Sequence, residues 1–585
     1  MSTTQFAHNS KLTAASRAAA LDAMSDSEGL DILVIGGGVT GAGIALDAAT
    51  RGLRTGIVEA GDWAAGTSAW SSKLVHGGLR YLYNLDFKLV AESLRERGLL
   101  LNKIAPHLVK AQPFLWPLKM PVIERAYSAV GIGMYDAMAF AGARGKKTVP
   151  AQRHFTKKGT KEIFPDIKNS VFTGAIQFYD ARVDDARLVV DLVRTASGYG
   201  ALAASRTQVV RVNKDAAGKV IGATVRDLET GTERDIKANH IINATGVWTE
   251  ESEALANEDT GLKVLASKGI HIIVPRDRIK ATSGIFTMTE KSVLFIIPWQ
   301  RYWIIGTTDT PYHEDIENPV ATEKDIDYVI MQANKLLENE LTRDDVISTY
   351  AGLRPLLQPK LKSGSETAST KVSREHTVTE VAPGMSAIAG GKLTGYRVMA
   401  EDAVDFALGG RAKSKPSITE NIPLVGADGY QAALASSEKI AQKHGWTSDR
   451  MDSLFERYGS EISEILALID SYAELGKPLA HAPQFLRAEV LYAVRAEGAL
   501  HLEDVLIRRV RLDLEQTDRG LSSAEEILAI MAPELGWSEA DAARELELYG
   551  QRVEAIAQAQ TRQTDSEATG LLAASGHVAP RVELS

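Results

Sequence analysis

The sequence Asp31-Ile-Leu-Val-Ile35-Gly36-Gly-Gly38-Val-Thr-Gly41 decides the fold of this chain. Its apolar first half is typical of a strand buried on both faces of a parallel sheet. The glycines follow at once, and residues 42–51 then carry apolar side chains at helical spacing before Gly52, a common helix stop. Thr55-Gly-Ile-Val-Glu59 predicts the next strand. The stretch therefore predicts a strand–helix–strand unit of about thirty residues with the G-x-G-x-x-G pattern of a dinucleotide site.

The three glycines and the residue that ends the second strand each have a role in such a site. Gly36 permits the tight turn, Gly38 lets backbone N–H groups approach a pyrophosphate, and Gly41 lets the helix pack closely on the strand. Glu59 can accept hydrogen bonds from ribose hydroxyls and would repel a 2'-phosphate. A glycine triplet alone is a common turn, but the full context favours a nucleotide site for NAD or FAD rather than NADP.

Composition excludes several classes of protein. The 585 residues are 44% hydrophobic and 24% charged, which suits about three or four domains with substantial cores. A net charge of -9 and the lack of a long Lys/Arg run argue against nucleic acid as a partner. Because the chain has no cysteine, disulfides, thiolate chemistry and cysteine-ligated metals are excluded. We therefore expect an organic redox cofactor and predict no metal site.

The segment that follows Glu59 favours FAD over NAD. Gly66-Thr-Ser-Ala-Trp-Ser-Ser-Lys-Leu-Val-His-Gly-Gly-Leu-Arg-Tyr81 is polar and glycine-bearing where a simple NAD domain would continue into another helix and strand. Its small hydroxyl residues are suited to line a long cofactor that runs outward from the sheet. A generic surface loop is the alternative interpretation.

Two later glycine turns are candidates for the same site. Asn243-Ala-Thr-Gly246-Val-Trp248 ends a predicted strand with small residues that let backbone approach a ligand. Ala389-Gly-Gly-Lys-Leu-Thr-Gly-Tyr396 precedes a helix pattern at 397–408, whose N-terminal dipole would stabilise the anion formed when a flavin is reduced. Each motif is also compatible with an ordinary turn.

The rest of the chain divides into a mixed α/β region and a helical one. Residues 1–28, rich in Ala, Ser, Thr and Asp and without the apolar core of a secretory signal, predict a disordered leader. After about residue 410 the pattern is predominantly helical, and residues 561–585 predict a flexible tail. No run of ~18 apolar residues occurs, so we expect no membrane-spanning helix.

Six motifs, taken in order, resemble the FAD-dependent glycerol-3-phosphate dehydrogenase family. They are Gly36-x-Gly38-x-x-Gly41, Ser71-Ser-Lys-Leu-Val-His-Gly-Gly-Leu-Arg-Tyr81, Ser267-Lys-Gly-Ile-His271, Ile305-Gly-Thr-Thr-Asp309, Gly352-Leu-Arg-Pro355 and Gly390-Gly-Lys-Leu-Thr394. The likeness covers roughly residues 30–405, and residues 489–511 resemble the helical C-terminal domain of that family. Trp70 and Gly395 depart from the family pattern.

The resemblance implies an α/β fold with three parts. These are a Rossmann-type FAD-binding domain like that of glutathione-reductase-type and amino-acid-oxidase-like flavoproteins, a β-rich substrate cap, and an all-helical C-terminal domain. We expect the FAD-binding domain at 29–94, 167–249 and 356–410, the cap at 95–166 and 250–355, and the helical domain at 411–560.

The resemblance also implies which residues bind the cofactor. The candidate FAD-binding residues are Gly36, Gly38, Val39, Thr40, Gly41, Glu59, Ala60, Thr67, Ser68, Ser72, Lys73, Leu74, Gly246, Gly391, Lys392, Leu393 and Thr394.

The chemistry implied is transfer of the C2 hydride of sn-glycerol 3-phosphate to FAD while a base removes the hydroxyl proton, which leaves dihydroxyacetone phosphate. A phosphate clamp suits arginine, whose guanidinium makes bidentate, charge-assisted hydrogen bonds. His271 is the candidate base because its unperturbed pKa lies near neutral pH. The candidate catalytic residues are Arg80, Arg354, Lys392 and Thr394 at the phosphate and Tyr81 and His271 at the alcohol. For Arg354 a structural ion pair, and for His271 a satisfied strand histidine, are the alternatives.

Family members pass electrons to a membrane quinone as peripheral proteins on the cytoplasmic face, so the resemblance implies a cytoplasmic chain with that partner. Residues 127–140 are apolar enough to lie at a membrane interface, or to form a buried cap helix. Arg508, Arg509 and Arg511 suit either anionic headgroups or a salt-bridged helix face. The oligomeric state stays open, and a homodimer is one of the states allowed.

Three rival functions remain at this point. A glycerol-3-phosphate oxidase would share the fold and the substrate but return electrons to oxygen as hydrogen peroxide. An amino-acid oxidase of the same flavin lineage would bind a carboxylate, which the predicted set of cations fits less well than a phosphate dianion. A non-catalytic flavin-binding protein is the third.

Overall fold

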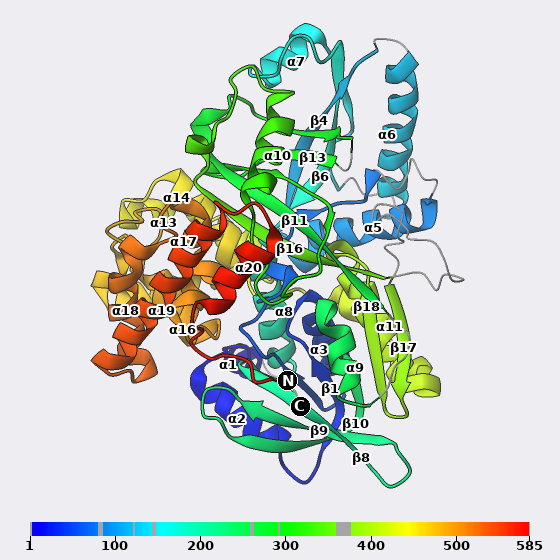
Figure 1. The fold of residues 1–585 in the computed structure, drawn as a ribbon, viewed down its shortest axis with the longest axis vertical. Helices are drawn as coiled ribbons and strands as arrows, with labels where there is room; N and C mark the ends of the chain where they lie inside the picture. Colours follow the sequence, from blue (N-terminus) through cyan, green and yellow to red (C-terminus); the bar gives the residue numbers. More distant parts are fainter. Residues whose placement is uncertain are drawn as a thin grey trace.

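The computed structural model describes most of the chain. The described residues are 3–79, 86–120, 123–142, 148–257, 263–290, 293–357 and 376–583. These residues form three parts: a Rossmann-type domain and a cap, each built on one sheet, and a helical domain. In Figure 1 the Rossmann-type domain lies at the bottom, the cap lies above it, and the helical domain, coloured yellow to red, lies beside both.

The glycine motif lies at the centre of an eight-stranded sheet, in the order β17-β18-β10-β1-β2-β7 with β8 and β9 attached to β10. Strands β1, β2, β7, β10 and β18 run parallel. The bounds are β1 Leu30–Ile35, β2 Thr55–Val58, β7 Leu202–Ala204, β8 Thr207–Lys214, β9 Val220–Asp227, β10 Glu233–Asn243, β17 His376–Ala382 and β18 Met385–Gly390. This is the predicted α/β domain.

Both faces of this sheet are covered, which explains why β1 is apolar throughout. Helices α3 (Val39–Thr50), α8 (Asp185–Gly198) and α11 (Tyr396–Leu408) pack on one face with Ile32 and Val34. Helix α2 (Ala14–Met24) and the β8–β9–β10 meander cover the other. Helix α9 (Thr249–Ala254) follows β10.

The cap is built on a ten-stranded, mainly antiparallel sheet. Its strands are β3 Leu74–Val75, β4 Lys110–Leu118, β5 Arg153–Thr156, β6 Gly174–Arg182, β11 Val264–Pro275, β12 Gly284–Met288, β13 Val293–Pro298, β14 Tyr302–Gly306, β15 Thr310–Pro311 and β16 Ser348–Leu357. Helices α7 (Lys157–Ile163) and α10 (Glu323–Asn334) pack on one face, and α5 (Phe87–Leu99) and α6 (Ile123–Gly142) on the other. Strands β3 and β6 belong to this sheet, although the sequence placed them in the FAD-binding domain.

The C-terminal domain is helical, and its two cores contain most of its apolar side chains. Its helices are α12 Tyr430–Leu434, α13 Ser437–His444, α14 Ser448–Tyr458, α15 Ile462–Ser471, α16 Arg487–Ala496, a π-helical turn at Asp504–Arg509, α17 Leu512–Glu515, α18 Leu521–Leu535, α19 Glu539–Ala559 and α20 Asp565–Ala574.

The prediction of a disordered leader at 1–28 is wrong for the residues described. Helices α1 (Thr3–Asn9) and α2 occupy this segment, and Leu21 and Met24 are fully buried. Arg17 donates a hydrogen bond to the carbonyl of Ser205 at 2.7 Å and forms an ion pair with Asp227. Helix α2 has apolar side chains at helical spacing on one face, but its many small residues give it the composition of a loop. Composition alone therefore did not predict it.

The prediction of a flexible tail at 561–585 is also wrong where the chain is described. Helix α20 packs on the cap through Leu572, and its Asp565 forms an ion pair with buried Lys268 of β11. The hydroxyl groups of Thr569 and Tyr312 lie 2.9 Å apart. Tertiary contacts, which a composition argument cannot see, order this segment.

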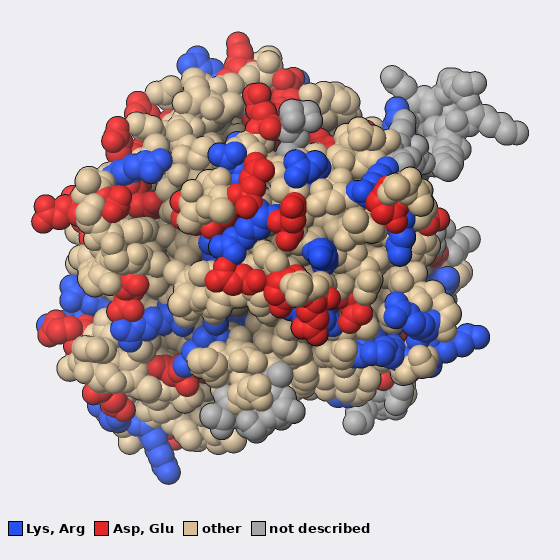
Figure 2. Space-filling view, turned by 90° about the horizontal axis from the view of Figure 1, so that it is seen from below, with Lys and Arg blue, Asp and Glu red and all other residues tan. Residues whose placement is uncertain are grey.

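Charged side chains on the lower face of the molecule are mixed in sign. Figure 2 shows lysine and arginine side chains interspersed with aspartate and glutamate over this face. Opposite charges therefore lie side by side there instead of in separate patches.

Candidate active site

The turn between β1 and α3 has the shape of a phosphate cradle because only glycine fits it. Gly36 has a φ of +108°, and a Cβ added there would lie 2.7 Å from the carbonyl oxygen of Ala244. A Cβ at Gly41 would lie 1.8 Å from the carbonyl oxygen of Gly36. Helix α3 begins after Gly38 without a side-chain cap, so its N-terminal dipole faces the turn. This geometry fits a dinucleotide pyrophosphate.

A cavity of about 870 Å³ extends from this cradle between the two sheets, a volume within the range of ligand sites. It brings together residues that lie far apart in the sequence. The predicted residues that line it are Gly36, Gly38, Val39, Thr40, Glu59, Ala60, Thr67, Ser68, Ser72, Leu74, Gly246, His271, Arg354, Gly391, Lys392 and Leu393. Gly41 is not among the lining residues; it permits the contact between α3 and β1.

The carboxylate of Glu59, the residue after β2, is held in place by two backbone hydrogen bonds. Its two carboxylate oxygens accept hydrogen bonds from the backbone N–H of Gly37 at 2.6 Å and of Gly61 at 2.7 Å. A carboxylate has about four lone-pair directions, so these two bonds leave acceptor capacity for ribose hydroxyls. The carboxylate of Glu59 can therefore accept the ribose hydrogen bonds that the sequence predicts for it.

Arg354 and His271 enter the cavity from adjacent strands of the cap. Strands β11 and β16 are antiparallel, with Ser267 opposite Arg354 and His271 opposite Tyr350. Arg354 Nη2 donates to Thr307 Oγ1 at 2.9 Å and to the Thr308 carbonyl at 3.0 Å. Its Nη1 lies 3.4 Å from Asp309 Oδ1. The Ile305–Asp309 motif thus holds the guanidinium in place at the cavity wall.

Two glycines make room for these side chains. A Cβ at Gly269 would lie 2.3 Å from Arg354 Nη2, and a Cβ at Gly306 would lie 2.4 Å from His271 Cδ2. Both contacts are closer than real Cβ atoms tolerate. The glycines of these two family motifs therefore position the arginine and the histidine.

His271 is a buried, neutral histidine. Its Nε2 lies 2.9 Å from Ser72 Oγ, and its ring stacks on Tyr350 with centroids 4.7 Å apart. Burial, together with the charges of Arg354 and Lys73, lowers the pKa of His271 well below its usual value. The pKa of His271 in the fold is therefore lower than the unperturbed value on which the sequence argument relied, and the ring is available as a proton acceptor without first losing a proton.

The turn at 390–395 brings Lys392 to the cavity but not Thr394. Gly390 and Gly391 have φ values of +81° and +77°. Thr394 is buried, and its hydroxyl both donates to the carbonyl and accepts from the N–H of His76, each at 3.1 Å. Helix α11 begins after Gly395 without a side-chain cap. Thr394 therefore holds two cavity segments together and does not line the site.

Lys73 does not line the cavity either. Its ammonium is buried and donates to Asp185 Oδ1 at 2.7 Å and to the Ala69 carbonyl at 3.1 Å. This corrects its prediction as an FAD-binding side chain. Arg80 and Tyr81, the other two predicted catalytic residues, lie outside the described residues.

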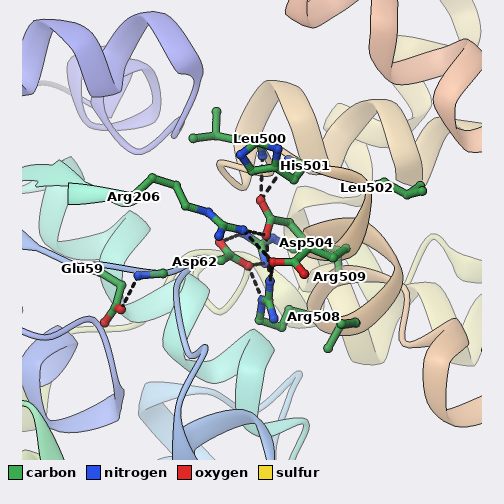
Figure 3. Close-up of polar contacts among 12 residues, drawn as sticks. Glu59, Asp62, Arg206, Leu500, His501, Leu502, Asp504, Arg508 and Arg509 are labelled. Atoms are coloured by element: carbon green, nitrogen blue, oxygen red, sulfur yellow. Dashed lines mark hydrogen bonds and ion pairs between the residues drawn. The ribbon is translucent and has the colours of Figure 1, made fainter. Parts of the chain in front are cut away.

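The helical domain braces the loop that follows Glu59. Figure 3 shows Asp62 between Arg508 and Arg509; Arg509 holds its two oxygens at 2.8 and 2.9 Å. Arg508 also donates to Asp504 at 2.7 Å, and Arg206 joins the same carboxylate. Arg508, like its neighbour, is buried. These arginines are thus the salt-bridged helix face, not a surface for lipid headgroups.

Several cavity residues escaped the sequence reasoning. They are Trp70, His76, Thr207, Gln208, Trp248 and Arg581 among others. Trp70 and Trp248 stood inside motifs that the sequence singled out, so an aromatic in a glycine-rich loop was an available signal. Gln208 and Arg581 had none, because only the fold brings β8 and the C-terminal segment to the cavity. Within the described ranges no group of acidic and histidine side chains could hold a metal ion, and no helix there has the length and apolarity to cross a bilayer.

Comparison with known proteins gives a consistent family. Residues 31–397 match the family model of FAD-dependent oxidoreductases, and 417–542 match the C-terminal domain of alpha-glycerophosphate oxidase. Glycerol-3-phosphate dehydrogenase 2 of Mycobacterium tuberculosis is 48% identical over 94% of this chain and 92% of its own length. The mitochondrial glycerol-3-phosphate dehydrogenase of Mus musculus is 35% identical over 91% of this chain and 74% of its own.

Two solved structures extend the likeness to the fold. Glycerol-3-phosphate dehydrogenase from Bacillus halodurans, complexed with FAD, has a TM-score of 0.74 at 29% identity, covering 93% of this chain and 98% of that one. The L-alpha-glycerophosphate oxidase of Mycoplasma pneumoniae, with FAD bound, has a TM-score of 0.51 at 16% identity and covers 65% of this chain and 94% of its own. The second likeness concerns the fold alone.

Proposed function

We infer that this chain, which belongs to the family of FAD-dependent glycerol-3-phosphate dehydrogenases, oxidises sn-glycerol 3-phosphate to dihydroxyacetone phosphate. One observation carries the substrate assignment: Arg354 and Lys392 both line the cavity that begins at the glycine cradle. Two cationic residues in one cavity suit a phosphate dianion. Bound FAD supplies the hydride acceptor of the reaction.

The protein's own groups bind the substrate and take the hydroxyl proton. Arg354, fixed by Asp309 and the Thr307 hydroxyl, orients the phosphate. His271, neutral and held between Ser72 and Tyr350, is the acceptor for the C2 hydroxyl proton. Both side chains come from the cap, so the cap determines which substrate binds, and the Rossmann-type domain holds the cofactor.

Anaerobic bleaching of the flavin tests this function. Adding sn-glycerol 3-phosphate to the FAD-loaded protein without oxygen should abolish the visible flavin absorbance, with one dihydroxyacetone phosphate formed per flavin. Glycerol, which lacks the phosphate, is the matched control and should bleach it far more slowly. FAD-replete protein that keeps its absorbance with glycerol 3-phosphate would contradict the assignment.

The oxidase remains a second candidate, because the C-terminal match is to a glycerophosphate oxidase domain. The dehydrogenase relatives over nearly the whole chain favour the first function. We propose a membrane quinone as its electron acceptor. Peroxide formed per substrate in air separates the two. We expect little peroxide and fast reoxidation by a soluble quinone analogue; one peroxide per substrate at full turnover rate would favour the oxidase.

The buried state of His271 predicts how flavin reduction depends on pH. Since its pKa is lowered well below 6.5, the imidazole stays neutral from pH 6 to 9, and the wild-type reduction rate should show no inflection near 6.5 from this group. His271→Gln should slow flavin reduction by about 10²- to 10⁴-fold, the usual contribution of a general base. Stopped-flow absorbance across this range measures both effects. Reduction of the variant at the wild-type rate would exclude the base role.

Helix α6 is the proposed site of peripheral membrane contact. Its buried face packs Ile132 and Tyr135 into the cap. On the opposite face Tyr127, Val130 and Met134 are 63%, 65% and 38% exposed. These positions share one side of a helix, and such an apolar stripe is suited to lie in a bilayer interface, near the quinone pool.

Vesicle binding tests this surface. The variant with both Val130→Glu and Met134→Glu should lose most sedimentation with anionic liposomes, because two charges would have to enter the acyl boundary. Ile221→Glu is the matched control: this side chain is 44% exposed on β9, on the Rossmann-type domain. Equal sedimentation of the double variant and the wild type would remove α6 from the contact.

A further inference from the structure

The chain that follows α19 passes over the cap and returns to the Rossmann-type domain. Helix α20 is anchored on the cap by Asp565, Thr569 and Leu572, as described above. From there residues 575–583, here called the C-terminal strap, run down to the sheet that holds the glycine motif. Figure 1 shows this segment in red, running from α20 to the C label over the Rossmann-type domain.

The end of the strap is tied to both lobes. Val582 N donates to Gln208 Oε1 at 2.8 Å, and the Val582 carbonyl accepts from Gln208 Nε2 at 2.9 Å. Gln208 is buried on β8. Its side-chain amide bonds both the N–H and the carbonyl of Val582, as the backbone of a neighbouring strand would. The guanidinium of Arg581 lies 4.5 Å from the ring centre of Trp248, and its Nε lies 3.3 Å from Glu317 Oε1 in the cap.

The strap contacts the cavity beside Glu59, because Thr207, the residue before Gln208, donates its backbone N–H to the Glu59 carbonyl at 2.7 Å. Arg581, Val582 and Glu583 line the cavity together with Gln208 and Glu59. Glu59 marks where ribose hydroxyls bind in a Rossmann-type site. The strap therefore forms the wall beside the adenosine half of the dinucleotide.

We propose that the C-terminal strap retains FAD by closing the adenosine end of the cavity, so that the cofactor leaves only after Val582 and Arg581 detach from Gln208 and Trp248. The anchors are modest interactions: two hydrogen bonds, one cation–π contact and the partly exposed ion pair of Arg581 with Glu317. Together they hold the strap against the cavity, and their joint effect is to slow the release of FAD. The proposal rests on FAD binding but not on the identity of the substrate.

Release of FAD measures the effect of the strap directly. Three variants are compared with wild type: a chain that ends at Ser575, Gln208→Ala and Arg581→Ala. The matched control is Arg544→Ala, an exposed arginine on α19. The holoprotein is diluted, and the recovery of free-flavin fluorescence is followed without glycerol 3-phosphate. We expect release about tenfold faster from the shortened chain and several-fold faster from each point variant, with the control unchanged, in line with the loss of about 1 kcal/mol per anchor.

Thermal unfolding with and without FAD separates retention from a purely structural role. A ligand stabilises the folded state according to its occupancy, so weaker retention must shrink the rise in Tm that FAD produces. Wild-type release rates in all three variants, or equal Tm losses with and without FAD, would overturn the proposal. If the shortened chain does not fold, the two point variants give the same decision. Because the assay contains no substrate, its outcome is independent of the proposed activity.

Discussion

Arg354→Ala should raise the KM for glycerol 3-phosphate by about 10²- to 10³-fold, the largest rise in KM that we expect from any single change in the cavity. Truncating one partner of a charge-assisted hydrogen-bonded pair costs roughly 2–5 kcal/mol, and 1.4 kcal/mol corresponds to a factor of ten. The guanidinium is held ready by Thr307, Thr308 and Asp309, so little is lost to ordering when the phosphate arrives.

Steady-state kinetics together with the flavin content make this prediction sharp. The variant should keep its FAD, because Arg354 lies on the cap strand and the glycine cradle lies on the other sheet. Arg343→Ala is the matched control, an exposed arginine of the same cap whose ion pairs to Glu323 and Asp327 lie at the surface. An unchanged KM in Arg354→Ala would remove this residue from the clamp and leave it the structural ion pair with Asp309.

Gly269→Ala probes the same clamp without removing its charge. The added Cβ would meet the Arg354 guanidinium, so the variant should shift this group and raise the KM for glycerol 3-phosphate, with a smaller effect on the affinity for FAD.

Gly269 also illustrates what the sequence can predict. A glycine in a motif indicates a close approach, but only the fold identifies the side chain that approaches it.

The nucleotide half of the site was accessible from sequence because its physics is local. The β1 turn, α3 and Glu59 fall within about thirty consecutive residues, and their hydrophobic spacing and glycine positions constrain one another. The cap half was not local. Arg354 and His271 lie on strands β16 and β11, and their convergence depends on sheet register. A resemblance predicted that convergence; composition and periodicity did not.

The errors share one cause, which is tertiary burial of segments with unremarkable composition. Residues 14–24 and 565–574 are rich in Ala, Ser and Thr, yet each is a helix packed against elements distant in the sequence. Lys73 was expected at the cofactor because it stands in a family motif, but its partner Asp185 is 112 residues away. Neither contact has a signature in local sequence.

Asp185→Ala should destabilise the folded protein by about 3–5 kcal/mol, a large part of the ~5–15 kcal/mol typical of a whole domain. The carboxylate is buried and accepts from Lys73 Nζ at 2.7 Å, from Ser71 Oγ at 2.7 Å, and from Arg511 of the helical domain. Burial and the charge of Arg511 already lower the pKa of Lys73, and Asp185 opposes that shift. Without this carboxylate, Lys73 keeps the Ala69 carbonyl and Arg511 keeps Asp184, but the two buried cations share one negative charge fewer.

A second substitution separates the lost ion pair from general damage to the core. In the background of Asp185→Ala, Lys73→Met removes one unpaired buried charge, so the double variant should unfold at higher urea than the single variant. Asp470→Ala supplies the control, because its pair with Lys443 is 62% exposed on both sides and such pairs contribute at most about 1 kcal/mol. Urea unfolding followed by flavin and tryptophan fluorescence gives all three values. If the double variant is no more stable than Asp185→Ala, the loss of stability comes from lost packing around Ser71 and not from the unpaired charge. The helical domain would then not stabilise the loop around Ser71 and Lys73 through this charge cluster.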